Sequence, residues 1–174
     1  MSTLNNQFAK LAFIKKNSLI HHNCSDDTLT VIVRRVQKTK IEPILGTPFY
    51  KELLAAVTTG VTPAQKTLLD DYLIPTLLGY CEYFAAKFYN VEIRNKNTGK
   101  ANDEHTTAAT DEENSMFRQE LHDMAKIYEQ TLIGYLKDNK ETFPKYCEWS
   151  DLCEDVQAKP EQDSFDTSFS IISK

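Results

Sequence analysis

The fold of this chain is decided by the run VQKTKIEPILGTPFYKELL (residues 36–54), the linker TTGVTP (residues 58–63) and the run LLDDYLIPTLLGYCEYFAAKF (residues 68–88). Apolar residues recur in both runs at helical spacing, while proline, glycine and threonine mark where helices begin and end. Pro43 disfavours helical geometry in the residue before it, so we expect the helix that arrives through Ile41 to end there.

A Thr-Pro pair occurs twice, and each pair is expected to begin a helix. After a permissive turn at Gly46, Thr47 would cap the free amides of a helix whose first residue is Pro48. In the same way, Thr62 would cap a helix whose first residue is Pro63. The helices predicted from these signals cover about residues 48–58 and 63–73.

A further proline, Pro75, lies inside the second apolar run. Because proline removes a backbone donor and clashes with the preceding turn, we expect a kink or break near Ile74 and a further helix to about Asn90. The apolar residues of this run are Leu68, Leu69, Tyr72, Leu73, Leu77, Leu78, Cys81, Phe84, Ala85 and Phe88.

Two more helices flank these runs. The first would be capped by Ser25 or by one of the two aspartates after it and would run to about Lys40, with acids near its start and bases near its end. The second is long and covers about residues 111–139. Side chains expected to face the core are Leu29, Ile32, Val33 and Val36 on the first, and Phe117, Leu121, Met124, Tyr128, Leu132, Tyr135 and Leu136 on the second.

Three segments are less regular. Residues 11–20, LAFIKKNSLI, are consistent with a short strand or with an arm. Val91 and Ile93 alternate with polar residues before an Asn- and Gly-containing turn, which predicts one arm of a hairpin. After Pro144, a short helix over residues 145–156 would pack Tyr146, Trp149 and Leu152.

The size and composition of the chain indicate one domain. It has 174 residues and a formal net charge of −5, and chains of this size bury a continuous core. Apolar runs stay below the roughly 20 residues of a membrane helix, and the first 18 residues do not resemble a secretory signal. We expect a protein made in a cytosol, with no membrane partner. The cysteines, Cys24, Cys81, Cys147 and Cys153, form no CxxC pair and are expected to be free thiols.

Cofactors, metals and catalysis are not expected. His21, His22 and Cys24 are residue types that zinc accepts, but adjacent histidines of an extended segment point apart and no second ligand pair follows. Motifs for a nucleophilic serine, a phosphate-binding loop or a zinc protease are absent from the sequence. Glu104-His105 would act as acid and base only inside a pocket. The sequence therefore predicts a protein that is not an enzyme.

Charge is unevenly distributed along the chain. Residues 10–40 carry seven basic and two acidic side chains, whereas residues 141–174 carry eight acidic and three basic ones. Opposite signs would orient one subunit on another, although charge runs also simply solvate a surface. The basic side chains lie on the outer face of an amphipathic helix and the chain is acidic overall, so we expect no more than passing contact with DNA.

Two polar segments are the predicted interaction sites. Residues 92–110 are too polar to build a core and would project as a loop, where contacts often lie. The C-terminal segment ends with apolar residues among Ser, Asp and Thr, and it would dock as an extended strand or hook, unless it is a frayed terminus. The predicted interface residues are Arg94, Asn95, Lys96, Asn97, Thr98, Gly99 and Lys100 in the loop, and Phe165, Phe169, Ile171 and Ile172 in the C-terminal segment.

The order and spacing of these signals resemble the head–tail connector (adaptor) proteins of tailed bacteriophages, over roughly residues 26–146. The residues that carry the resemblance are Gln37, Ile41, Pro43, Leu45-Gly46-Thr47, Phe49-Tyr50, Leu53, Leu69, Tyr72 and Ile74-Pro75, followed by the Asn95–Gly99 loop, the long helix and Phe143-Pro144-Lys145-Tyr146. This resemblance implies a small helical protein that forms a ring, commonly of twelve subunits, beneath the portal of the head. The projecting loop of such proteins lines the ring or reaches a neighbour.

We therefore expect a mainly α fold, a helical bundle of about five helices with a projecting loop or hairpin. Its parts would be an N-terminal arm or strand (1–25), a helical connector domain (26–156) and an extended C-terminal tail (157–174). The expected function is that of a structural virion protein, made in the host cytoplasm, that joins head to tail around a DNA channel. Its partners would be copies of itself, the portal protein, and a tail or next adaptor ring protein. The alternative is a cytosolic α-helical adaptor or regulatory protein that binds partners transiently.

Overall fold

The computed structural model describes residues 7–89, 92–93, 98–99 and 111–146, and their fold is mainly helical, as predicted. In chain order the helical elements are α1 (Leu11–Asn17), α2 (Asp26–Val36), the π turn η2 (Gln37–Ile41), α3 (Glu42–Leu45), α4 (Thr47–Thr59), α5 (Pro63–Thr67), the π turn η3 (Leu68–Leu73), α6 (Ile74–Tyr89) and α7 (Asp111–Asp138). Two short strands, β1 (Glu92–Ile93) and β2 (Thr98–Gly99), lie between α6 and α7 in sequence.

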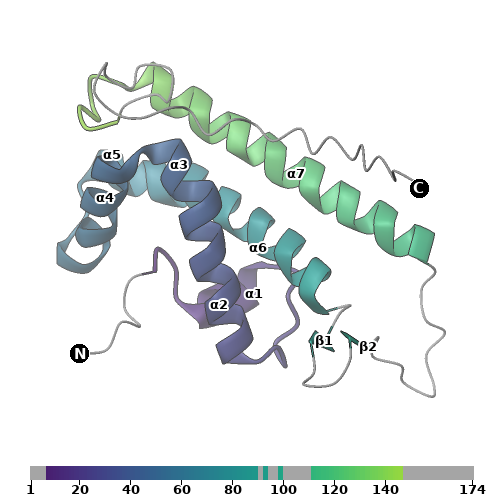
Figure 1. The fold of residues 1–174 in the computed structure, drawn as a ribbon. Coiled ribbons are helices and arrows are strands. Elements are labelled where there is room, and N and C mark those ends of the chain that lie inside the picture. The colour runs from purple at the N-terminus through teal and green to yellow at the C-terminus, as the bar shows by residue number, and fades with distance from the viewer. Residues whose placement is uncertain (1–6, 90–91, 94–97, 100–110, 147–174) are drawn as a thin grey trace, which may run out of the picture.

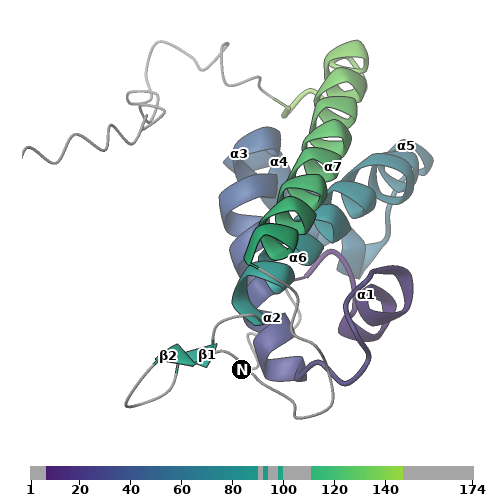
Figure 2. The same cartoon turned by 90° about the vertical axis from the view of Figure 1, so that its right-hand side faces the viewer.

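The long helices α6 and α7 run antiparallel, side by side, and α2 crosses α6 (Figure 1). α3, α4 and α5 gather where α6 begins, whereas α1 and the strands lie toward the other end. Figure 2 shows β1 and β2 standing away from the helices. The two strands pair antiparallel, with Glu92 opposite Gly99 and Ile93 opposite Thr98, which confirms the predicted hairpin.

The helix that contains Pro43 does not end at Ile41, so that prediction was wrong. Helical geometry continues through Glu42 (φ −59°, ψ −42°) to Leu45, and the N–H of Glu42 donates to the carbonyl of Gln37, five residues earlier. This wider π turn resets the hydrogen-bond ladder one residue before proline, whose missing donor then falls in the first turn of α3.

Pro75 is accommodated in the same way. The N–H of Ile74 donates to the carbonyl of Leu69, again five residues earlier, at the end of η3. The predicted irregularity is therefore present, but as a π turn inside a helix that continues from α5 through η3 into α6. A break near Ile74, which would separate two helices, was a wrong expectation.

The predicted helix starts have different outcomes. At Thr62 the capping box is present: its hydroxyl accepts from the N–H of Gln65, and the Gln65 side chain accepts from the N–H of Thr62. Thr47 instead lies inside α4, whose N-cap is Gly46 (φ 75°). The hydroxyl of Thr47 donates to Oε1 of Glu42 at 3.0 Å. The expected cap by Thr47 was therefore wrong.

The N-terminal residues that the structure describes belong to the domain and are neither a strand nor a separate arm. α1 is helical and buries Ile14 completely. Phe8 is also buried, its N–H donates to the side-chain carbonyl of Gln37 at 3.3 Å, and its ring meets that of Tyr50 edge-on at 5.3 Å. These contacts attach Phe8 to η2 and α4, and α1 packs on α2.

The core is continuous from α1 to the end of the described chain. Leu29, Ile32, Val33 and Val36 of α2 are buried, as predicted. After α7 the chain turns back, and Phe143 and Tyr146 pack near Phe49 of α4, with ring centroids 5.3 and 6.5 Å from it. Trp149 and Leu152, predicted to lie in a short helix, fall outside the described residues, as do Cys147 and Cys153.

Candidate interaction surface

One face of α7 is buried against the domain, and the adjoining face is largely exposed. The buried side chains are Leu121, Ala125, Leu132 and Leu136, and they contact α6 and η3. Among the described residues, α7 makes its main contacts with α6 and η3, and it lies at the edge of the fold above α6 (Figure 1).

The exposed face of α7 carries five large apolar side chains, which we call the α7 stripe. Their exposed fractions are 65% for Met116, 48% for Phe117, 52% for Met124, 61% for Ile127 and 39% for Tyr128. The prediction that Phe117 and Met124 face the core was wrong, whereas that for Leu121, Leu132 and Leu136 is confirmed. Tyr135 is partly buried against the core. Tyr128 is 39% exposed, but its ring lies close to Gly79 of α6. Several large apolar side chains exposed on one side of a helix are typical of an interaction surface.

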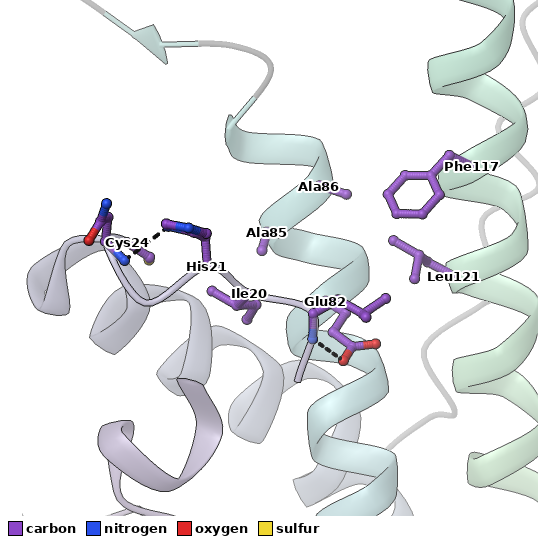
Figure 3. Close-up of a pocket in the computed structure, with 10 residues that line it drawn as sticks. Ile20, His21, Cys24, Glu82, Ala85, Ala86, Phe117 and Leu121 are labelled. Atoms are coloured by element: carbon purple, nitrogen blue, oxygen red, sulfur yellow. Dashed lines mark hydrogen bonds between the residues drawn. The ribbon is translucent and has the colours of Figure 1, made fainter. Parts of the chain in front are cut away.

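The α7 stripe borders a pocket of about 380 Å³. Its walls come from three places in the sequence: the loop after α1, the end of α6 and the start of α7. Figure 3 shows Ala85 and Ala86 between the loop residues on one side and the side chains of Phe117 and Leu121 on the other. The lining residues are Leu19, Ile20, His21, Asn23, Cys24, Glu82, Ala85, Ala86, Phe117 and Leu121.

Lys15 holds the loop that forms one wall of this pocket. Its ammonium donates to the backbone carbonyls of His22 (3.1 Å) and Cys24 (2.6 Å) and pairs with the carboxylate of Asp26 at 2.6 Å. On the other side of the loop, the N–H of Leu19 donates to Oε1 of Glu82 at 2.8 Å. The pocket wall is therefore fixed to α1, α2 and α6 by polar contacts.

The titratable side chains that line this pocket are Glu82, His21 and Cys24. Burial raises the pKa of Glu82, and the hydrogen bond from Leu19 only partly opposes this. His21 accepts from the N–H of Asn23 at 3.2 Å, and its ring lies 4.1 Å from that of His22. Within the described ranges, no three His, Cys, Asp or Glu side chains are placed to hold a metal ion. Cys24 and Cys81 are both buried, and among the described residues neither forms a disulfide, as predicted.

A second hollow, of about 310 Å³, is polar and mainly cationic. It is lined by Tyr83, Lys87, Ser115, Arg118, Gln119 and His122. Part of its hydrogen-bonding capacity is used internally, since the carboxylate of Asp123 accepts from Gln119 at 2.8 Å and lies 3.4 Å from His122. This hollow suits an anionic group, but nothing in it selects one anion over another.

A polar cluster joins η2, α6 and α7. The Tyr80 hydroxyl donates to the carboxylate of Glu129, which also accepts from Lys126 at 3.0 and 3.2 Å. The ammonium of Lys40 lies 5.0 Å from the centroid of the Tyr80 ring. Burial lowers the pKa of Lys40, as does neighbouring Lys126, while Glu129 opposes both. Because these groups satisfy one another, the cluster positions helices.

Most of the predicted interface residues cannot be placed in the structure. Thr98 and Gly99 form β2, at the projecting hairpin, whereas Arg94, Asn95, Lys96, Asn97 and Lys100 lie outside the described residues. The same holds for Phe165, Phe169, Ile171 and Ile172, and for Glu104-His105. Sequence reasoning missed the pocket altogether, because its walls come from three segments that no periodic pattern connects.

These features define a small, mainly helical domain in which the exposed α7 stripe lies beside an apolar pocket. A family model matches residues 41–155, and the chain belongs to that family, which is described as a family of unknown function (DUF6712). Comparison with curated proteins and with solved structures gives no match. Among the described residues, no helix combines the length and the apolar character needed to cross a bilayer.

Proposed function

We propose that this protein is a ring-forming subunit of the head–tail connector of a tailed bacteriophage, located between the portal and the tail. Its role is geometric: repeated contacts between subunits build the ring, which leaves an axial channel for DNA. The proposal assigns the protein no reaction and no cofactor.

The observation that carries the proposal is the α7 stripe. Met116 and Ile127 are more than half exposed. Burying their apolar surface would be favourable by about 25 cal/mol per Å². A monomer gains nothing from this arrangement, whereas a subunit of a ring covers the stripe with its neighbour. A closed ring needs a head-to-tail interface made by two different surfaces of each subunit.

Two further observations agree with the proposal. The Pro43, Gly46 and Pro75 signals that carry the resemblance to connectors lie at helix boundaries or π turns in the fold. The hairpin of β1 and β2 projects from the helices (Figure 2), the position from which connector loops reach a neighbour or line a channel.

The test is quantitative mass spectrometry of purified phage particles from the source of this sequence. We expect the protein in intact particles at a ratio near one to one with the portal protein, because portal and connector rings commonly have equal subunit numbers. Absence from infectious particles would overturn the proposal and favour a cytosolic helical adaptor that uses the same apolar surface transiently.

A further inference from the structure

We propose that the apolar pocket beside α7 is occupied, in the isolated protein, by the C-terminal segment of the same chain, residues 165–172. This inference concerns a contact within one chain and does not rest on the proposed ring function. It assigns an occupant to the pocket that Leu19, Ala86 and Phe117 border.

The pocket is suited to aromatic and aliphatic side chains. At about 380 Å³ it falls in the size range of sites that enclose small apolar groups. Ala85 and Ala86 leave room above α6, and Leu121 supplies an apolar wall on α7 (Figure 3). Leu19 on its rim is 72% exposed, so a docked apolar segment would remove surface from water on both sides of the contact.

The last ten residues have the composition that this pocket requires. Phe165 and Phe169 fall on one side of the segment whether it is extended, where residues alternate, or helical, where positions i and i+4 share a face. Ile171 in the first case, or Ile172 in the second, extends the same side. Asp166 is the single acid between Phe165 and the C-terminus, so the segment meets Glu82 with little like-charge repulsion.

The chain is long enough to reach. Tyr146 is buried near Phe49, at the end of the domain where α7 terminates. The helix from Phe117 to Asp138 rises about 32 Å at 1.5 Å per residue. The 19 residues from Tyr146 to Phe165 span up to roughly 60 Å when extended.

The tether also favours the same chain over a second copy. A linker of this length presents its end to the pocket at an effective concentration on the order of millimolar. A neighbouring molecule in a dilute solution is present at a far lower concentration. The segment of the same chain therefore fills the pocket first.

The experiment compares the full chain with a chain that ends at Asp163, which keeps the whole region matched by the family model. The probe is a fluorescein-labelled synthetic peptide of residues 163–174, and binding is followed by fluorescence anisotropy. We expect the shortened chain to bind the peptide and the full chain to bind it at least about tenfold more weakly, because its own segment competes. Circular dichroism verifies that both chains are folded.

Matched variants localise the contact. In the peptide, Phe165→Ser with Phe169→Ser should weaken binding at least about tenfold, since buried aromatic anchors dominate such contacts. In the shortened chain, Leu19→Ser with Phe117→Ser should also weaken binding of the unchanged peptide at least about tenfold. The control pair, Val31→Ser with Val57→Ser, changes exposed apolar residues of α2 and α4 and should leave peptide binding unchanged.

Three results would overturn the inference. The first is that the shortened chain binds no peptide at peptide concentrations up to about 1 mM, which would exclude even a weak specific site. The second is equal binding to both chains, which would show that the segment leaves the pocket open. The third is a dimer of the full chain that dissociates with Phe165→Ser and Phe169→Ser, which would place the segment on a second copy. None of these outcomes alters the particle ratio that tests the connector role.

Discussion

The backbone of α6 at Gly79 lies against the backbone of α7 at Ala125, so that a Cβ built on Gly79 would be 3.2 Å from the Cα of Ala125. The same Cβ would lie 3.3 Å from Cδ2 of Tyr128. These distances are shorter than ordinary van der Waals contact, and the atom at 3.2 Å belongs to backbone. Gly79 and Ala125 therefore set how closely the two long helices approach.

Gly79→Ala and Gly134→Ala are expected to change stability in opposite directions. Alanine inside a helix is worth about 0.5–1 kcal/mol over glycine. Apart from its chain neighbours and the backbone of its own helix, no atom of the described residues lies within 4 Å of a Cβ built on Gly134, so Gly134→Ala should gain that stability. At Gly79 the helices must separate, and overpacking of about 1–3 kcal/mol should exceed the gain. Urea denaturation measures both, and an equal gain at the two positions would contradict the close packing.

Thr47→Val should destabilise the junction of α3 and α4 by about 1–2 kcal/mol, because it removes the hydroxyl that donates to Oε1 of the buried Glu42 carboxylate. Glu42 is 8% exposed, and its other oxygen pairs with Lys38 at 2.5 Å. The control is Thr59→Val, which removes an exposed hydroxyl bonded to the carbonyl of Ala55. That change should stay within about 0.5 kcal/mol. Similar losses for both variants, measured by chemical denaturation, would show that the bond to Glu42 adds nothing.

Glu82→Gln should flatten the dependence of stability on pH. Burial raises the pKa of Glu82 in the folded protein, so between the unfolded pKa, about 4.3, and the raised folded pKa the folded state binds more protons. The free energy of unfolding contributed by this residue therefore falls as pH rises through that window. Glutamine does not titrate and still accepts from the N–H of Leu19. In thermal melts, the stability of the variant relative to the parent should increase from acidic to neutral pH. Parallel plots of melting temperature against pH would refute the prediction.

Met116→Ser with Ile127→Ser should leave the isolated subunit as stable as the parent, within about 0.5 kcal/mol per substitution, because both side chains are largely exposed. If the α7 stripe contacts a neighbouring subunit, the variant should be depleted from phage particles relative to the portal protein. Val31→Ser, on the exposed face of α2, serves as the matched control. Normal incorporation of the α7 variant would exclude the stripe from the ring interface.

The sequence predicted the type of most elements from local signals. The cap at Thr62, the hairpin after Val91 and the length of α7 follow from capping groups, turn residues and periodicity, which act over a few neighbouring residues. The amphipathic pattern of α2 correctly identified Leu29 and Val36 as core. The prolines were misread because the stop signal is also local, and a π turn before each one removes the conflict by resetting a single hydrogen bond.

The candidate site could not be predicted in the same way. Phe117 and Leu121 belong to one periodic pattern on α7, yet Leu121 is 9% exposed and Phe117 is 48% exposed. Periodicity identifies an apolar face but not how much of it a neighbour covers. That quantity depends on where α6 lies, which in turn depends on the approach of Gly79 to Ala125.

The amino-acid sequence by itself determined that this protein is helical and where most helices begin, because capping, proline chemistry and apolar spacing are interactions between near neighbours. Tertiary structure decided that Phe8 packs beside Gln37 and Tyr50, and that the side chains of the α7 stripe are exposed. It also decided that Leu19, Ala86 and Phe117 meet around one pocket. These outcomes depend on contacts between distant segments, whose geometry is set by how whole helices pack.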